Sequence, residues 1–500
     1  MNENLEKRLK RQIIGKPHRF LAIAPLGFEE TLAYELSLFG LEFPDDESAP
    51  HVTGDGKVEF FAKITEAWKA VAYSRVANRV FIHIADFKAE NFREFEKKAA
   101  EIPWELYLDK RTGNALQTRD ERGINIHVTC KHSRLYHSDA IAERLHNVIH
   151  SPAHDHSDSL ANSHSGEGRN QHSQSTTQHL YVTLIDDRCT IWQDLAGEEL
   201  YKRGHERFVN DAPLKETIAA GMLQEAFNAA TQALKHQPRI TLIDPMAGSG
   251  TFSLEAAYMA NGLIPGKCRN FALKHQPAFK PATWNHIVNS VNAKPNPSLR
   301  RNDDTELSLR RIDDSILSLL RNDNPILSLR RNEVTAAIPG TIQKIVTSDI
   351  SERAVEIIQH NVECCPLANI APSAAPTISP QLRDFFSYTA KEIAELCGES
   401  APVIVLNPPY GKRLDFDAPK LYTQIGKKFA ELARELAALG KQLTVAILAP
   451  KDDSRPGSKY TCTANLLHEC PALDPQQNSD AKNIVTSHGG LSLNAIIARI

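Results

Sequence analysis

The chain has 500 residues, of which 41% are hydrophobic, and its formal net charge is -3 at pH 7. This length allows two to four domains with sizeable cores, and the near-neutral charge argues against a protein that coats nucleic acid indiscriminately. No segment reaches the roughly 18 consecutive apolar residues of a membrane span, and the N-terminus lacks the apolar centre of a secretion signal. We therefore expect a soluble cytoplasmic protein without membrane contact.

Residues 1–17 are predicted to be a basic tail, because six Lys and Arg residues stand against two Glu residues within the first 19 positions. The tail is either a solvated segment or a local contact for nucleic acid. A ferredoxin-like unit is predicted over residues 18–87 from a β-α-β-α-β order. Its elements are a strand at 20–25, a helix at 27–38, a strand at 57–61, a helix at 67–79 and a strand at 80–84.

Residues 88–200 predict a second small α+β unit. Its elements are a helix at 88–108, a strand at 124–129, a helix at 139–149 and strands at 180–185 and 189–194. Residues 151–178 are rich in Ser, His, Asn and Gly and are expected to form a disordered loop. His154 and His156 in this loop have no surroundings that would fix a metal geometry, and the eight cysteines include no Cys-x-x-Cys pair, so no metal site is expected.

Residues 201–500 alternate helices with wholly apolar strands, which predicts a doubly wound, mostly parallel α/β sheet. The strands are expected at 240–243, 344–347, 403–406 and 443–448, and the helices at 216–235, after Gly250, at 351–362 and at 419–439. A decapeptide repeat at 298–331 reads as an inserted surface element, with polyanion binding by its arginines as the alternative. The strands after residue 452 are in doubt.

The segment Asp244-Pro-Met-Ala-Gly-Ser-Gly-Thr251 follows the first strand of this region. Gly248 and Gly250 permit a tight turn and a close backbone approach, and the next helix offers free N–H groups. The spacing fits neither a dinucleotide fingerprint nor a phosphate loop. An acid at the start of the turn instead favours a ligand with an ammonium group, held by Asp244, Ala247, Gly248, Ser249 and Gly250; ordinary turn chemistry is the alternative.

Two further acids stand where the next strands should end. Asp349 fits a contact with ribose hydroxyls, although an N-cap at Asp349 or Ser351 explains the same position. Asp384 fits a contact with an adenine amino group. In doubly wound sheets ligands bind at the carboxyl ends of the strands, so we expect these acids near Asp244.

The fourth strand ends in Asn407-Pro-Pro-Tyr410. With the preceding elements, this motif resembles class I S-adenosylmethionine-dependent methyltransferases that act on exocyclic amino nitrogens of bases. The resemblance implies that Asn407 and Pro408 accept the two hydrogens of the amino group, which frees the nitrogen lone pair for the methyl group, and that Asn407 also borders the cofactor. Tyr410 would stack on the extruded base. The motif alone leaves adenine N6, guanine N2 and protein glutamine open as acceptors.

Three other stretches extend the resemblance. Ala22–Glu30, Thr129–Ala140 and Gly204–Thr217 are similar to segments of THUMP-domain-containing methyltransferases that modify guanine N2 in 23S ribosomal RNA. This family implies a THUMP RNA-binding domain over residues 88–200, a methyltransferase domain over 201–500 and a ribosomal RNA of the large subunit, or its precursor, as partner. Lys131 and Arg134, with His132 as a further candidate, would contact phosphates.

Several alternatives stay open at this point. A tRNA guanine-N2 methyltransferase, a nucleic-acid adenine-N6 methyltransferase and a catalytically silent RNA-binding assembly factor fit parts of the same pattern. The chain holds no second methyltransferase module of the kind fused to some relatives, so a single modification is expected. The sequence gives neither the target nucleotide nor the oligomeric state.

Overall fold

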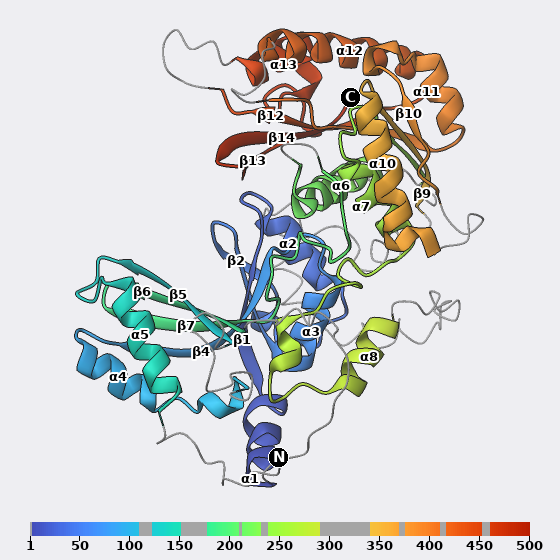
Figure 1. Ribbon diagram of the computed structural model, residues 1–500. Coiled ribbons are helices and arrows are strands. Elements are labelled where there is room, and N and C mark those ends of the chain that lie inside the picture. The colour runs from blue at the N-terminus through green and yellow to red at the C-terminus, as the bar shows by residue number, and fades with distance from the viewer. Residues whose placement is uncertain are drawn as a thin grey trace, which may run out of the picture.

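Two seven-stranded sheets organise the computed structural model (Figure 1). The structure describes residues 3–109, 123–151, 178–209, 213–231, 239–290, 341–369, 376–410, 417–452 and 461–500. The decapeptide repeat, the pair His154 and His156, and all of the predicted disordered loop except its first and last residues lie outside these ranges. None of the helices that the structure describes is long and apolar enough to cross a membrane.

The first sheet has the strand order β2-β3-β1-β4-β7-β6-β5. Its strands are β1 (Pro17–Ile23), β2 (His51–Gly54), β3 (Lys57–Lys63), β4 (Arg79–Lys88), β5 (Ile124–Lys131), β6 (Gln178–Ile185) and β7 (Arg188–Asp194). Neighbouring strands are antiparallel except β5 and β6. The helices of this part are α1 (Glu3–Leu9), α2 (Glu29–Ser37), α3 (Ile64–Tyr73), α4 (Phe92–Ala100) and α5 (Ser138–Ile149).

The prediction of two separate small units was incomplete, because β4 pairs with β7 and joins both units in one sheet. The predicted helix at 88–108 was too long: β4 runs to Lys88, and the helix occupies only α4. The basic N-terminus is not simply a solvated tail. It forms α1 and a π-helical turn at Lys10–Ile14, which bury Leu9 and Ile13 in the core.

The second sheet has the order β10-β9-β8-β11-β12-β14-β13 and is parallel except for β14, which runs antiparallel to both neighbours. Its strands are β8 (Ile240–Asp244), β9 (Ile342–Asp349), β10 (Pro380–Leu382), β11 (Ala401–Leu406), β12 (Thr444–Pro450), β13 (Ala481–His488) and β14 (Leu491–Arg499). The helices are α6 (Glu216–Thr231), α7 (Thr251–Ala260), α8 (Pro281–Ser290), α10 (Glu352–Cys364), α11 (Ala390–Cys397), α12 (Ala418–Ala438) and α13 (Cys462–Glu469). This arrangement confirms the predicted doubly wound α/β fold.

Short 3₁₀ turns connect several of these elements. They lie at Asp46–Ser48, Trp104–Leu106, Ala272–His275, Pro366–Asn369, Phe385–Ser387 and Pro471–Leu473. Helices α11, α12 and α13 cover one face of the second sheet, and α6, α7 and α10 lie on its other face (Figure 1).

The two sheets share one large core, which explains why the halves of the chain sit tightly together. Phe20 and Phe28 from the first half belong to the same buried cluster as Ile218 and Leu242 from the second half. Helix α6 lies between the sheets, and a Cβ atom added at its Gly221 would stand 2.7 Å from the Phe28 ring. The close contact of helix and ring therefore requires glycine.

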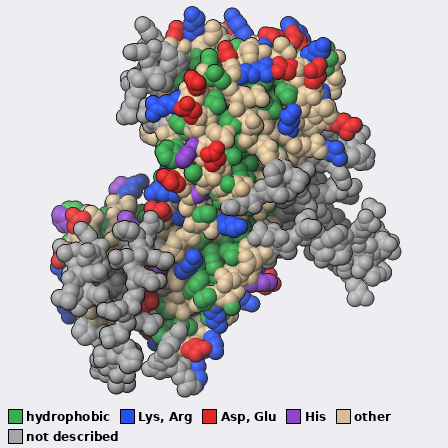
Figure 2. Space-filling model, turned by 45° about the vertical axis from the view of Figure 1, so that its right-hand side comes forward, with side chains coloured by type: hydrophobic (Ala, Val, Ile, Leu, Met, Phe, Trp, Pro, Cys, Tyr) green, Lys and Arg blue, Asp and Glu red, His purple; other side chains and the backbone are tan. Residues whose placement is uncertain are grey.

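On the outer surface, Figure 2 shows Lys and Arg mixed with Asp and Glu over the upper part of the molecule, in keeping with the small net charge.

Candidate functional site

Four neighbouring strands bring the predicted polar residues to one edge of the second sheet. Asp244 ends β8, Asp349 ends β9, and Asp384 and Asn407 follow β10 and β11. The strands β10, β9, β8 and β11 are consecutive neighbours, and parallel neighbours lie about 4.8 Å apart. The predicted clustering at the carboxyl ends of the strands is therefore present.

Asp244 is fully buried at the end of β8. Its Oδ2 accepts hydrogen bonds from the backbone N–H of Ser253 at 3.2 Å and from the Ser253 hydroxyl at 2.7 Å. Its Oδ1 is buried and has no hydrogen-bond partner among the described residues. Burial raises the pKa of this carboxyl to about 7. A buried carboxylate oxygen without a donor is costly, so this oxygen is prepared for a cationic or hydrogen-bonding ligand.

The glycine-rich loop adopts the tight turn that its sequence predicts. Gly248 and Gly250 have φ values of 57° and 79°, in the left-handed region that glycine tolerates best. The N–H of Gly248 donates to Asp349 Oδ2 at 2.9 Å, and Gly250 stands immediately before α7. No atom of the described residues lies within 4 Å of the Cβ position at Gly248. A ligand can approach this part of the loop closely.

Asp349 and Asp384 both have structural partners. Asp349 accepts the N–H of Ser351 at 2.9 Å with Oδ1, in addition to Gly248, and Ser351 caps α10. The cap that the sequence offered as an alternative is thus present at Ser351. Asp384 is half-buried and accepts the N–H of Phe386 at 3.0 Å. Contacts of these two acids with a ribose and an adenine remain predictions.

The Asn-Pro-Pro-Tyr motif presents a second buried oxygen without a partner. Asn407 Oδ1 has no hydrogen-bond donor among the described residues. Pro408 is buried and Pro409 exposed. Tyr410 is half-buried and packs against the large core, and burial raises the pKa of its phenol to about 12. The ring is therefore less exposed than the sequence suggested, and its stacking on a base remains a prediction.

Two residues that sequence reasoning missed hold the loop in place. Arg207 donates to the hydroxyls of Ser249 and Thr251 and to Glu216 Oε1, with an Nη2–Oγ distance of 3.0 Å to Ser249. Asn361 on α10 donates to the carbonyl oxygens of Phe208 and Ser249. Arg207 lies inside the Gly204–Thr217 segment, so the family resemblance pointed to the segment without showing what this side chain contacts.

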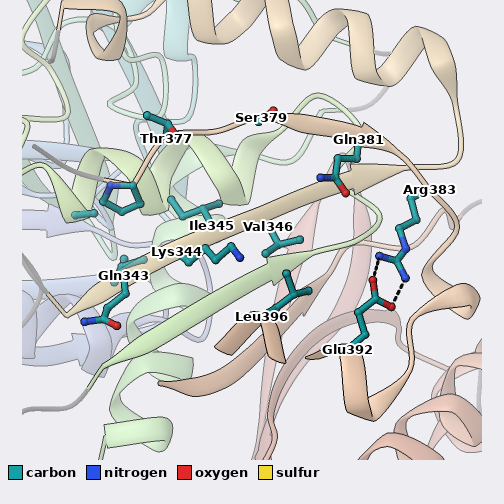
Figure 3. A pocket seen from close by; sticks show the side chains of 13 residues that line it. Gln343, Lys344, Ile345, Val346, Thr377, Ser379, Gln381, Arg383, Glu392 and Leu396 are labelled. Atoms are coloured by element: carbon teal, nitrogen blue, oxygen red, sulfur yellow. Dashed lines mark hydrogen bonds and ion pairs between the residues drawn. The ribbon is translucent and has the colours of Figure 1, made fainter. Parts of the chain in front are cut away.

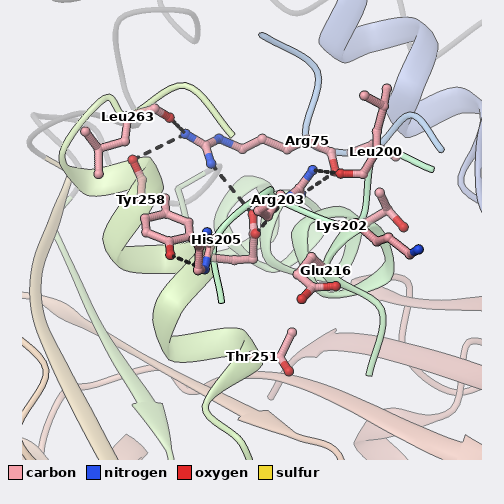
Figure 4. Close-up of polar contacts among 12 residues, drawn as sticks. Arg75, Leu200, Lys202, Arg203, His205, Glu216, Thr251, Tyr258 and Leu263 are labelled. Carbon is pink, nitrogen blue, oxygen red and sulfur yellow. Dashed lines mark hydrogen bonds and ion pairs between the residues drawn. The ribbon is translucent and has the colours of Figure 1, made fainter. Parts of the chain in front are cut away.

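The loop is also connected to the first half of the chain. Arg203 forms a buried ion pair with Glu255 of α7 at 2.9 Å and donates to the carbonyl oxygen of Arg75. Arg75 in turn donates to the carbonyl oxygens of Tyr258 and Leu263, as Figure 4 shows. Through Arg203, the segment before α6 thus contacts both the first half of the chain and helix α7, which follows the glycine-rich loop.

The predicted phosphate contacts lie on the first sheet. Lys131 is exposed at the end of β5. Arg134 is exposed but already engaged, because it pairs with Glu90 and lies 3.7 Å from Asp187 Oδ2. His132, the further candidate, has a φ of 51°. No described contact tests whether these residues bind RNA.

A hollow of about 880 Å³ lies elsewhere, along the edge of β9 (Figure 3). Residues Ile342–Val346 line one side of it, before the carboxyl end of the strand, and Thr377 and Gln381 lie opposite. Arg383 at its rim is paired with Glu392 at 2.6 Å. This hollow is therefore not the predicted cofactor site.

Comparison with known families agrees with this geometry. Residues 203–449 match the model of the RMKL-like methyltransferase domain, and residues 19–81 match the RlmL ferredoxin-like domain. Residues 203–449 therefore carry an RMKL-like methyltransferase domain. The two matches confirm the predicted order of a ferredoxin-like unit before a methyltransferase domain and agree with the family resemblance. The predicted domain boundaries, including those of the THUMP unit, stay predictions.

Curated relatives match most of this chain within longer chains. The chain is 28% identical over 415 residues to a ribosomal RNA large subunit methyltransferase K/L from Shewanella oneidensis, covering 82% of this chain and 46% of the relative. A methyltransferase of the same name from Psychromonas ingrahamii is 24% identical over 409 residues, covering 81% and 43%. The chain thus spans less than half the length of these relatives.

Solved structures share the fold across nearly the whole chain. SMU.472, solved in complex with SAH, aligns with a TM-score of 0.61 at 20% identity over 97% of this chain and 98% of its own. A possible methylase from Clostridium difficile 630 aligns with a TM-score of 0.62 at 20% identity over the same shares. A protein described as a predicted N6-adenine-specific DNA methylase from Listeria monocytogenes aligns with a TM-score of 0.60 at 19% identity, covering 96% of each chain. These likenesses confirm the predicted fold class.

Proposed function

We propose that this RMKL-like methyltransferase transfers a methyl group from S-adenosylmethionine to the exocyclic N2 of a guanine in 23S ribosomal RNA. The observation that carries the proposal is a pair of buried oxygens, Asp244 Oδ1 and Asn407 Oδ1, which have no hydrogen-bond partner among the described residues. They lie at the ends of the adjacent strands β8 and β11. Large-subunit ribosomal RNA as substrate is supported by the names of the curated relatives.

The residues at the strand ends fit the cofactor. Asp244 and the N–H groups around Gly248 would hold the methionine part, whose ammonium group suits the free carboxylate oxygen. Asp349 would meet the ribose and Asp384 the adenine, while Ala247, Ser249 and Gly250 shape the loop. When bound, S-adenosylmethionine supplies an electrophilic methyl group on a sulfonium. The described residues contain no group of three or more His, Cys, Asp or Glu side chains that could hold a metal, and the proposal invokes none.

Asn407 and Pro408 would position the acceptor. An amino group on a base is a poor nucleophile, because its lone pair is delocalised into the ring. Hydrogen bonds from its two N–H groups to Asn407 Oδ1 and to the Pro408 carbonyl oxygen would let the nitrogen become pyramidal and direct its lone pair outward. Catalysis then rests on position rather than on a strong base. Tyr410 would stack on the extruded guanine after a modest movement of its half-buried ring.

RNA would be held by the first half of the chain, with Lys131 as a phosphate contact. Arg134 can serve in the same way only if the RNA replaces its carboxylate partners, Glu90 and Asp187. A ribosomal RNA substrate, free or within a precursor particle, also implies the cytoplasmic location that the sequence suggested.

The proposal is tested by transfer of labelled methyl from S-adenosylmethionine to unmodified 23S ribosomal RNA, 16S ribosomal RNA and tRNA, followed by nucleoside analysis. The expected product is N2-methylguanosine in 23S ribosomal RNA. N2-methylguanosine in tRNA alone would show the tRNA enzyme, and N6-methyladenosine would show the adenine enzyme. Cofactor binding by calorimetry without transfer to any RNA would support a silent RNA-binding protein instead.

A further inference from the structure

One face of the first sheet carries a row of rings that the proposed function has not used. Helices cover the face that buries Phe20, Val80 and Leu180, so alternate residues point to the opposite face. On that opposite face the strand register aligns side chains from six strands in the order β3-β1-β4-β7-β6-β5. This aromatic row consists of Phe61, Arg19, His83, Trp192, Tyr181 and His127.

Five of the six members of the aromatic row, all but Phe61, have a described contact with another member. The His127 and Tyr181 rings are stacked with centroids 4.5 Å apart, and the His83 ring meets Trp192 edge-on at 5.0 Å. The Arg19 guanidinium lies over the Trp192 ring, 5.2 Å from its centroid. With strands about 4.8 Å apart, the row spans about 24 Å. Such a row offers successive flat surfaces at a spacing set by the sheet.

The two ends of the row are accessible. Phe61 is 38% exposed, which is unusual for a phenylalanine in a sheet, and His127 is also exposed. Tyr181 is half-buried, while Trp192 is largely covered by its neighbours. The stacking surface therefore lies mainly at Phe61 on one side and at Tyr181 and His127 on the other.

Charge on the same face suits a polyanion. Lys57, Lys63 and Lys131 alternate with inward residues on β3 and β5, so they share the face of the row, and all three are exposed. Glu59 and Asp86 on this face are both paired with Arg19, at 2.7 Å and 3.6 Å. The exposed lysines thus place positive charge at the margins of the rings.

The row also lies toward the strand ends that hold the candidate site. The β4–β7–β6–β5 part of the sheet extends to the left in Figure 1, below the β13–β14 hairpin. The turn of that hairpin lies at the same edge of the second sheet as the carboxyl end of β12, since Pro450 pairs with Leu493. An RNA segment on the row would therefore approach the molecule from the side of the candidate site.

We propose that the aromatic row is a stacking surface for unpaired nucleotides of the RNA substrate, flanked by lysines that contact phosphates. The inference rests on the proposed function for the identity of the RNA. Rings accept any unpaired base on their faces, whereas a duplex keeps its base faces stacked inside and offers mainly backbone. The row therefore favours a single-stranded loop or end over a helix.

The test compares binding of a fluorescein-labelled single-stranded RNA of mixed sequence with binding of the duplex formed with its complement, by anisotropy and without cofactor. The double variant Phe61→Ala/His127→Ala removes the two exposed ends of the row. Tyr34→Ala is the matched control, because Tyr34 on α2 is also 38% exposed and lies outside the row. We expect the double variant to bind the single strand at least about fivefold more weakly, as loss of stacking predicts. We expect the duplex and the control to change less than about twofold.

The salt dependence gives a second readout. Loss of stacking should leave the slope of log affinity against log salt unchanged. Lys131→Ala should make that slope shallower by about one unit, the amount expected for one lost phosphate contact. Equal losses for both RNAs, no loss for the single strand, or a changed slope in the double variant would overturn the inference. Methyl transfer by the wild-type protein to 23S ribosomal RNA is measured on the same preparation. Its absence would contradict the proposed function, while the comparison of variants still decides the role of the row.

Discussion

At the scale of residues, the site depends on a few buried oxygens and on the side chains that hold the loop beside them. Asp244 was predictable, because an acid at the end of an apolar strand and before two glycines is a recognisable pattern. The unpartnered state of its Oδ1 and the high pKa were not predictable, because both depend on burial by distant segments. Arg207 was missed for a related reason: its sequence neighbours do not reveal that it contacts Ser249 and Thr251, more than 40 positions away.

The pKa of Asp244 leads to a pH dependence of cofactor binding. Burial raises this pKa to about 7, so in the empty protein the carboxyl is mostly protonated at pH 6 and mostly ionised at pH 7.5. An ammonium group binds the ionised form, so affinity for S-adenosylmethionine should rise with pH and be about tenfold weaker at pH 6 than at pH 7.5. Calorimetry at several pH values measures this. Asp244→Asn should bind weakly with no such trend, and a wild-type affinity that stays constant across this range would contradict the assignment.

Arg207 should act as a positioning residue for the loop. Arg207→Lys keeps the charge but loses the planar fork that reaches Ser249, Thr251 and Glu216 together. We expect the KM for S-adenosylmethionine to rise about tenfold with a smaller change in kcat, since the loop and not the acceptor is disturbed. Arg434→Lys, at a side chain that is 77% exposed, is the control and should change neither constant. A fall in kcat alone would count against the positioning role.

At the scale of elements, apolar runs predicted the parallel strands well. Strands β8, β11 and β12 are buried on both faces, and such strands read as continuous hydrophobic segments. The β13–β14 hairpin was not predicted, because Ile484 and Val485 are the only large apolar residues of β13 and the strand lies in the region without clear family resemblance. The pairing of β4 with β7 was missed because it joins residues 100 or more positions apart, which local periodicity does not report.

Helix α6 gives a prediction at this scale. Alanine is favoured over glycine in a helix by about 1 kcal/mol, so Gly221→Ala would stabilise an isolated helix. Here the added Cβ would meet the Phe28 ring at 2.7 Å, and overpacking a core costs about 1 to 3 kcal/mol. We expect a net loss in the free energy of unfolding, measured with urea. The matched comparison repeats the change in a Phe28→Leu background, where the ring is gone. There Gly221→Ala should lower the free energy of unfolding by less than it does in the wild-type protein. Stabilisation by Gly221→Ala would show that the contact is not tight.

At the scale of the whole molecule, the two halves form one unit rather than two domains joined by a linker. The shared core ties the two parts together, and so does Arg203, which pairs with Glu255 of α7 and donates to the carbonyl oxygen of Arg75. The sequence predicted the two halves and their order, but not this shared interior, because the pattern of apolar residues does not show which surfaces meet. The arrangement suits the proposed function, in which one half holds RNA and the other presents the reacting groups.

Breaking the buried pair should therefore affect the molecule as a whole. Glu255→Gln leaves Arg203 buried without a counter-charge, which costs about 3 to 5 kcal/mol for pairs of this kind. We expect a single unfolding transition in urea, shifted to lower concentration, because the halves share one core. Glu198→Gln, which breaks an exposed pair with Lys202, should change stability by less than about 0.5 kcal/mol. Two separate transitions in the wild-type protein would contradict the single-unit account.

The most direct measurement of the central claim compares wild type and Asn407→Ala for three quantities: binding of S-adenosylmethionine, binding of 23S ribosomal RNA, and formation of N2-methylguanosine. If Asn407 Oδ1 accepts a hydrogen from the target amino group, the variant should keep its affinity for RNA and most of its affinity for the cofactor. Its methyl transfer should fall by at least about a hundredfold, the scale of removing one preorganised polar contact to the reacting group. Unchanged formation of N2-methylguanosine by the variant would contradict the account.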